Sequence, residues 1–198
     1  MRVCLSAILV LLLASVASAQ FRQGDFEMTL LGTVGSMNET REYTSNELEL
    51  DDDYDESHSY GYVSFMPAYY LIDGLAAELE IGIRAMEGIS PMQAVILNLG
   101  YTHKLPGSAL ALFGRVGYGL SNSWSIPVFL EQYGGRSDDF DVSIINVGAG
   151  AKILVSRSAF IRAELNYRIQ SYERGSDLLT IDYTYSSMAL LFGVGLVL

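Results

Sequence analysis

The chain has 198 residues, half of them hydrophobic, and a formal net charge of -11 at pH 7. Its mean hydropathy of +0.26 is high for a soluble exported protein, and its acidity argues against nucleic-acid binding, which requires a basic surface. The length suits one domain. Abundant glycine (19) and tyrosine (13) beside scarce proline (4) fit a protein of many strands, turns and aromatic rims.

The amino-terminal segment has the three parts of an export signal. Arg2 supplies a positive charge, residues 3–16 form an apolar stretch, and residues 17–19 (Ala-Ser-Ala) form a small-residue cleavage site. The apolar stretch is shorter than the ~20 residues that a membrane-spanning helix needs. We therefore expect a signal peptide at residues 1–19 and a single mature domain at residues 20–198.

Eight later segments alternate apolar and polar residues, which is the pattern of a β-strand with two different faces. The clearest example is residues 75–86, where Leu79 and Ile81 fall on one face and Glu78 and Glu80 on the other. In chain order, the expected strands lie around residues 25–35, 58–69, 75–86, 95–102, 112–119, 145–153 and 161–170, with a last strand that ends at Leu198.

The connections between these strands alternate in length. Those after the second, fourth and sixth strands are short, and the others are mostly longer, above all residues 36–57 and 121–139. Bacterial outer-membrane barrels have even strand numbers, with short turns on one side and longer loops on the other. We therefore predict an all-β, eight-stranded antiparallel transmembrane β-barrel, an up-and-down meander in the outer membrane. In that orientation residues 36–57 and 121–139 are extracellular and both mature termini are periplasmic.

A soluble sandwich is the alternative architecture, because its antiparallel sheets also alternate. No apolar face of the eight strands carries a charge, and a charge at the bilayer midplane of a lipid face costs about 2–4 kcal/mol. Aromatic residues near the strand ends are typical of the girdles of a membrane barrel. We expect one girdle to contain Tyr69, Tyr70, Tyr101 and Phe160, and the other Tyr118, Tyr172 and Tyr183.

The hairpin MPAYYLIDGLAAELEIG, residues 66–82, combines a proline-aromatic strand end, a hydrophobic-Asp-Gly turn and an alternating strand. It resembles the outer-membrane protein β-barrel domain family, which includes small eight-stranded barrels similar to the membrane domain of outer membrane protein A. The resemblance covers residues 20–198. It implies contact with outer-membrane lipid and lipopolysaccharide, and insertion by the outer-membrane assembly machinery. Such chains usually end in an aromatic residue that this machinery recognises, whereas this chain ends in Leu198.

The polar faces of the strands should line the lumen, which in an eight-stranded barrel is just wide enough for side chains to fill. Unpaired charges are costly in a low-dielectric interior, and the four acids and five bases on these faces nearly balance. We therefore predict a plugged lumen held by paired ions, with a gated channel as the alternative. The predicted network consists of Glu27, Glu78, Glu80, Arg84, Arg115, Lys152, Arg162, Glu164 and Arg168.

The two long loops hold the other candidate residues. Acids at alternate positions of the first loop resemble part of a calcium loop, although the glycine and the final glutamate of such a loop are missing. A solvated, self-repelling loop is the alternative. The candidates for a weak divalent site are Asp51, Asp53 and Asp55. Apolar residues of the second loop could contact an extracellular ligand or pack the barrel mouth, and these are Trp124, Phe129 and Tyr133.

An enzyme would need a nucleophile and a base within reach of one another. His58 and Ser59 are adjacent and so point to opposite faces of a strand, and His103 has no evident nucleophile. The only cysteine, Cys4, lies in the signal peptide. We therefore predict a monomeric protein that has no enzymatic activity and no cofactor. It would serve envelope stability or loop-mediated surface interaction, with a porin-like channel for small solutes or hydrophobic molecules as the alternative.

Overall fold

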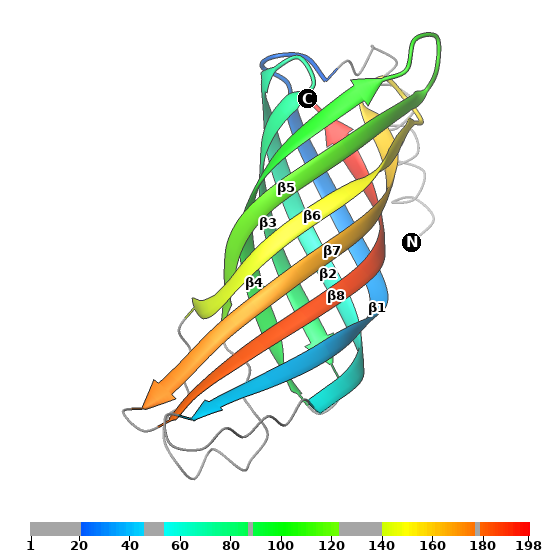
Figure 1. The fold of residues 1–198 in the computed structure, drawn as a ribbon. Coiled ribbons are helices and arrows are strands. Elements are labelled where there is room, and N and C mark those ends of the chain that lie inside the picture. The colour runs from blue at the N-terminus through cyan, green and yellow to red at the C-terminus, as the bar shows by residue number, and fades with distance from the viewer. Residues whose placement is uncertain (1–20, 46–53, 87–88, 123–139, 177–178) are drawn as a thin grey trace.

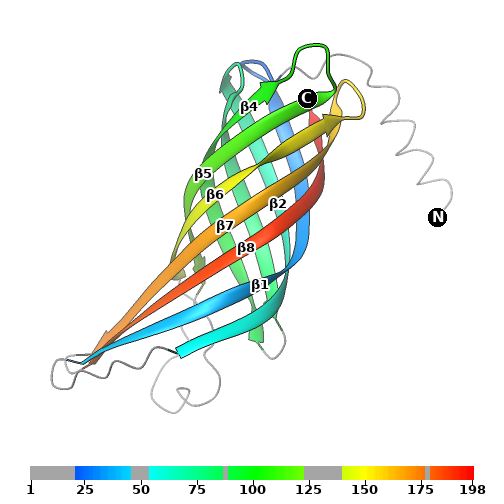
Figure 2. The same ribbon diagram turned by 45° about the vertical axis from the view of Figure 1, so that its right-hand side comes forward.

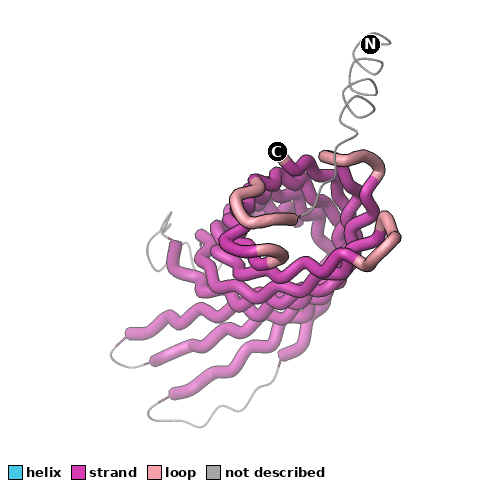
Figure 3. Tube along the Cα trace, turned by 90° about the horizontal axis from the view of Figure 1, so that it is seen from above, coloured by secondary structure: helices cyan, strands magenta, loops and turns pink. Residues whose placement is uncertain are grey.

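The computed structural model describes residues 21–45, 54–86, 89–122, 140–176 and 179–198. They form eight antiparallel strands that close into a barrel in chain order (Figure 1), which confirms the predicted fold class. The strands are β1 (Phe26–Ser45), β2 (Tyr54–Ile72), β3 (Leu75–Met86), β4 (Ile89–Lys104), β5 (Leu110–Asn122), β6 (Phe140–Leu154), β7 (Ala159–Ser176) and β8 (Leu179–Val197). Pairing of β8 with β1 closes the ring that Figure 3 shows end-on. In the described residues no helix is long and apolar enough to cross a membrane.

The two faces of the sheet are reversed relative to those of a soluble protein. Large apolar side chains point outward and are exposed, among them Leu97 at 63% and Leu165 at 55%. Charged side chains point inward, and Lys152 and Arg162 are fully buried. A soluble monomer rarely exposes a contiguous apolar patch of more than a few hundred Å². An apolar outer band around a polar interior is instead the arrangement of a barrel that lies in lipid.

Three tight turns lie at one end of the barrel, at residues 73–74, 105–109 and 155–158. Gly74 has φ +80°, and a Cβ there would lie 2.6 Å from the carbonyl oxygen of Thr102, so the first of these turns requires glycine. The carboxyl terminus lies at the same end, where Leu198 N donates to the carbonyl oxygen of Phe26 at 2.8 Å. We call this the short-turn end.

The opposite end corrects the prediction of a long loop at residues 36–57. β1 continues to Ser45 and β2 begins at Tyr54, and their pairing extends to Arg41 opposite Tyr54. Ladder hydrogen bonds join backbone groups and do not require apolar side chains, so polar sequence can continue a strand beyond the lipid. A spanning strand needs about 9–11 residues, whereas β1 has 20 and β8 has 19. In Figures 1 and 2 β7, β8 and β1 extend farthest from the carboxyl terminus.

The aromatic girdles are confirmed for some residues and corrected for others. Tyr69 and Tyr101 point outward and are half exposed near the short-turn end, and Tyr118 is exposed toward the far end of β5. Tyr70 and Phe160 were wrongly placed in a girdle, because both are buried inside the barrel. Successive side chains of a strand point to opposite faces, so Tyr70 points inward where Tyr69 points outward. The side chains of Tyr172 and Tyr183 lie outside the described part of the structure.

Candidate functional site

The structure places all nine predicted lumen residues inside the barrel, and none is more than 5% exposed. They come from five strands. β1 contributes Glu27, β3 contributes Glu78, Glu80 and Arg84, β5 contributes Arg115, β6 contributes Lys152, and β7 contributes Arg162, Glu164 and Arg168.

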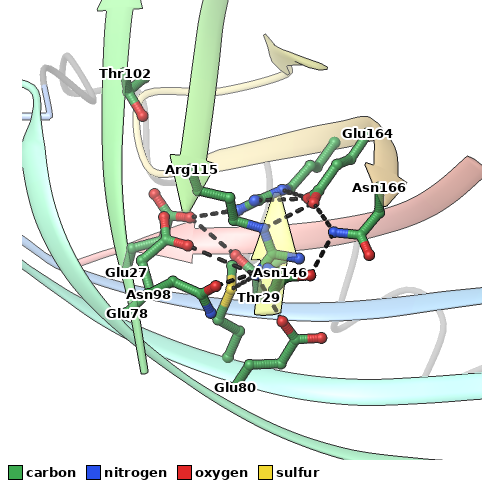
Figure 4. A network of polar contacts seen from close by, with 12 residues as sticks. Glu27, Thr29, Glu78, Glu80, Asn98, Thr102, Arg115, Asn146, Glu164 and Asn166 are labelled. Carbon is green, nitrogen blue, oxygen red and sulfur yellow. Dashed lines mark hydrogen bonds and ion pairs between the residues drawn. The ribbon is translucent and has the colours of Figure 1, made fainter. Parts of the chain in front are cut away.

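Arg115 is the centre of the network (Figure 4). Its Nη1 lies 2.6 Å from Glu80 Oε2, and its Nε lies 2.7 Å from Glu164 Oε1. Glu78 Oε2 lies 3.8 Å from Nη1. The planar guanidinium thus faces three carboxylates from β3 and β7, an arrangement for which its fixed fork of donors is suited.

Glu80 links this centre to the rest of the lumen. Its Oε1 accepts from Arg168 Nη2 at 2.6 Å and from the Tyr62 hydroxyl at 2.7 Å. Arg168 Nε also donates to Asn146 Oδ1 at 3.0 Å. Asn98 and Asn166 extend the chain of amides, since Asn146 Nδ2 donates to Asn98 and Asn166 Nδ2 donates to Asn146. These hydrogen bonds therefore link polar side chains from several strands into one network across the barrel.

A second ion pair lies nearer the short-turn end. Lys152 Nζ lies 2.7 Å and 2.9 Å from the two carboxylate oxygens of Glu27. Glu27 also accepts from the Tyr70 hydroxyl at 2.8 Å and from Thr29 Oγ1 at 3.0 Å. Arg162 connects the two regions, because its Nη2 lies 2.8 Å from Glu164 and its Nη1 lies 3.7 Å from Glu27.

Arg84 is the basic residue of the lumen nearest the end of β3 that lies away from the short turns. Its guanidinium carbon lies 4.6 Å above the ring centroid of Tyr60. When the amide oxygen of Gln170 faces Arg84, it accepts from Nη1 at 2.7 Å and from Nη2 at 3.0 Å. The Tyr60 ring face and the Gln170 amide thus both contact the charged guanidinium of Arg84.

Glycine on the inward face makes room for the large charged side chains. A Cβ at Gly148 would collide with Glu164 Oε1 and lie 3.2 Å from Arg115 Nε. Gly148 therefore lies directly beneath the pair at the centre of the network. Gly100 makes room for Glu78 in the same way, so inward-facing glycine provides the space that the large charged side chains occupy.

Sequence reasoning missed several residues of this site. Phe113, Asn98, Asn146 and Asn166 lie on the polar faces, so the period of two was a signal that could have included them. Phe21 lies before the first strand and carried no such signal, although it is buried in the lumen.

The remaining candidate residues fall mostly outside the described part of the chain. This is true of Asp51, Asp53, Trp124, Phe129 and Tyr133, and of the side chains of Asp55 and His58. Within the described residues, no group of three or more His, Cys, Asp or Glu side chains could hold a metal ion. His103 is described and points outward near the end of β4.

A closed eight-stranded meander with an apolar outer band and a buried salt-bridge network defines a small outer-membrane β-barrel protein. The comparison with known families agrees with this class. The chain belongs to the outer membrane protein beta-barrel domain family, whose model matches residues 6–197. No curated protein matches the chain significantly.

Solved structures share the fold at low sequence identity. The N-terminal β-barrel domain of OprF from Pseudomonas aeruginosa is 18% identical, with a TM-score of 0.52 over 89% of this chain and 98% of that one. OprG from Pseudomonas aeruginosa is 13% identical, with a TM-score of 0.54 over 91% and 99%. Neisserial surface protein A is 12% identical, with a TM-score of 0.53 over 88% and 99%. At these identities the likeness shows the fold alone.

Proposed function

We propose that this protein is a plugged, non-enzymatic outer-membrane barrel that stabilises the envelope or presents its strand ends and loops to partners at the cell surface. The main support for a closed lumen is that its charged side chains pair with one another. Arg115, Lys152, Arg162 and Arg168 each lie within 2.8 Å of a carboxylate oxygen. Moving such side chains aside to open a pore would leave buried ions without partners, which is strongly unfavourable.

The surface role rests on the length of the strands. β1, β2, β7 and β8 have 18 to 20 residues each, about twice what the lipid requires. At the end opposite the short turns they continue beyond their apolar alternation, and Figure 2 shows β7, β8 and β1 extending farthest there. In the proposed orientation this end is extracellular, in contact with lipopolysaccharide, and both mature termini are periplasmic. A closed sheet has no lateral edge to pair with a second copy, which supports a monomer.

Conductance of the refolded mature chain in a planar bilayer tests the plug. Protein that is shown to be folded and inserted should give no ion steps. Stable, reproducible steps would overturn the plugged barrel and favour the porin-like channel for small solutes or hydrophobic molecules.

A complementation experiment separates the two proposed roles. A strain that lacks the protein is tested for detergent sensitivity, then supplied with the intact protein or with a variant in which Gly-Ser linkers replace residues 46–53 and 123–139. Equal rescue by both supports envelope stability by the barrel itself. Rescue by the intact protein alone supports a role for the loops, and rescue by neither contradicts both roles.

A further inference from the structure

The segment that precedes β1 folds across the short-turn end and sends one side chain into the lumen. Phe21 is 1% exposed, whereas its neighbours Arg22 and Gln23 are exposed. Phe21 has φ +47°, and it is the one described residue other than glycine with a positive φ. Non-glycine residues rarely adopt this conformation and persist in it where the surroundings hold them. The backbone is thus bent so that the Phe21 ring can enter the barrel.

Hydrogen bonds hold this segment, residues 21–25, to the first tight turn. Gly74 N donates to the Phe21 carbonyl oxygen at 2.8 Å, and Gly24 N donates to the Tyr70 carbonyl oxygen at 2.9 Å. Gln23 N donates to Asp73 Oδ1 at 2.9 Å. The segment is therefore fixed at several points and does not simply rest on the mouth.

The ring of Phe21 enters a socket of aromatic side chains from different strands. Its centroid lies 5.7 Å from that of Tyr70 and 6.4 Å from that of Phe160, the latter edge to face. Both distances lie in the range of favourable aromatic pairs. Small apolar residues complete the same buried cluster, and these are Ala68, Ala76, Ala111 and Val197.

Lys152 lies directly behind this socket. Its Nζ is 5.0 Å from the ring centroid of Phe21 and 5.1 Å from that of Phe160. The rings of Phe113 and Tyr70 lie 5.5 Å and 6.0 Å away. Three phenylalanine rings thus surround an ammonium that pairs with Glu27 and also donates to the hydroxyls of Tyr70 and Thr102. Of these rings, Phe21 alone does not belong to a strand.

We propose that Phe21 is an intramolecular stopper, an aromatic side chain that the chain itself supplies to seal the short-turn mouth and to shield the Lys152–Glu27 pair from water. The inference deepens the proposed plugged barrel and rests on it. It assigns the seal at this end to a single residue, and it defines the socket as a binding site for one aromatic ring.

The lysines of the chain permit a direct test. The sequence has two, Lys104 and Lys152. Lys104 is partly exposed near the same end of the barrel and Lys152 is fully buried. The folded mature protein is treated with a water-soluble amine-acylating reagent, and the modification of each lysine is followed by peptide mass spectrometry. In the wild type Lys152 should react at least ~tenfold more slowly than Lys104, because the reagent reaches it only through opening of the mouth.

The decisive variant is Phe21→Ala, in which Lys152 should react within about tenfold of the rate of Lys104. Phe21→Leu refills the socket with an apolar side chain and should restore protection. Phe26→Ala is the matched control, since it removes a nearby aromatic ring that points outward, and Lys152 should stay protected. Fold is verified by heat-dependent electrophoretic mobility for every variant.

Two results would overturn the stopper, namely rapid modification of Lys152 in the folded wild type or continued protection in folded Phe21→Ala. If Phe21→Ala does not fold, nuclear Overhauser contacts from the Phe21 ring to the rings of Tyr70 and Phe160 decide the matter in the wild type, and their absence rejects the proposal. A wild type that conducts ions rejects the plugged barrel. A silent wild type with Lys152 still protected in Phe21→Ala rejects only the stopper.

Discussion

Two regions of the lumen accommodate a buried cation in different ways. At the centre, Arg115 faces three carboxylates, those of Glu78, Glu80 and Glu164, within 3.8 Å. Near the short-turn end, Lys152 pairs with Glu27, donates to the hydroxyls of Tyr70 and Thr102, and has phenylalanine rings around it. The planar guanidinium faces several carboxylates at once, whereas the compact ammonium is met by one carboxylate and by neutral hydroxyls. Charge in this barrel is therefore balanced over the lumen as a whole and not by one-to-one pairs.

Arg115→Met should have the largest effect, because it withdraws one cation from three buried carboxylates. We expect the free energy of unfolding to fall by about 3–5 kcal/mol. The measurement is urea-induced unfolding in lipid vesicles, followed by tryptophan fluorescence. Arg157→Met removes an exposed arginine at a tight turn and should change stability by no more than about 0.5 kcal/mol. Similar losses in the two variants would show that the central pairing contributes little.

Lys152→Met should cost less, about 1–3 kcal/mol. Glu27 would keep its hydrogen bonds from Tyr70 and Thr29, and a thioether packs well against the aromatic rings that surround position 152. The same unfolding measurement checks this prediction. A larger loss of stability than in Arg115→Met would show that the ion pair near the short-turn end contributes more to stability than the central network.

The Lys152→Met, Glu27→Gln double variant measures the pair itself. If the two side chains interact as closely as their 2.7 Å separation indicates, the double variant should be more stable than the sum of the single losses predicts, by about 0.5–3 kcal/mol. Glu27→Gln combined with Lys104→Met provides the control and should be additive within about 0.5 kcal/mol. Additivity in both cycles would mean that Glu27 and Lys152 are independent.

Thr29→Val should have the smallest effect. It keeps the shape of the side chain and removes one hydroxyl donor, 3.0 Å from Glu27 Oε1. We expect a loss of about 0.5–1.5 kcal/mol in the same unfolding assay, because Lys152 and Tyr70 still bind Glu27. A loss as large as that of Lys152→Met would show that the ammonium and the hydroxyl are equally important to this carboxylate.

The alternation of side chains made much of this architecture predictable. A period of two assigns Glu80, Arg115 and Lys152 to the lumen without any knowledge of their partners, since the lipid-facing positions tolerate no charge. Which residues become partners depends on the tilt and closure of the barrel. In the sheet β3 is next to neither β5 nor β7, yet its side chains meet theirs across the interior. Phe21 was unpredictable for another reason, because tertiary contacts alone hold its backbone in a rare conformation.

The strand ends away from the short turns show the limit of hydropathy. The polar sequence beyond Gly35 resembles a loop, yet the ladder with β2 continues to Arg41. Apolar alternation marks the part of a strand that lies in lipid, and it carries no information about how far the backbone pairing continues into water.

The salt bridges of the lumen also constrain how the chain can enter the membrane. Glu27 and Lys152 lie on β1 and β6, and Glu80 and Arg168 lie on β3 and β7, so neither pair joins neighbouring strands. A sheet that is still open would hold these ions far apart, with the hydrocarbon of the bilayer as their alternative surroundings. Partial insertion is thus penalised at each ion pair that joins distant strands, which favours a concerted change from an open sheet to an embedded cylinder.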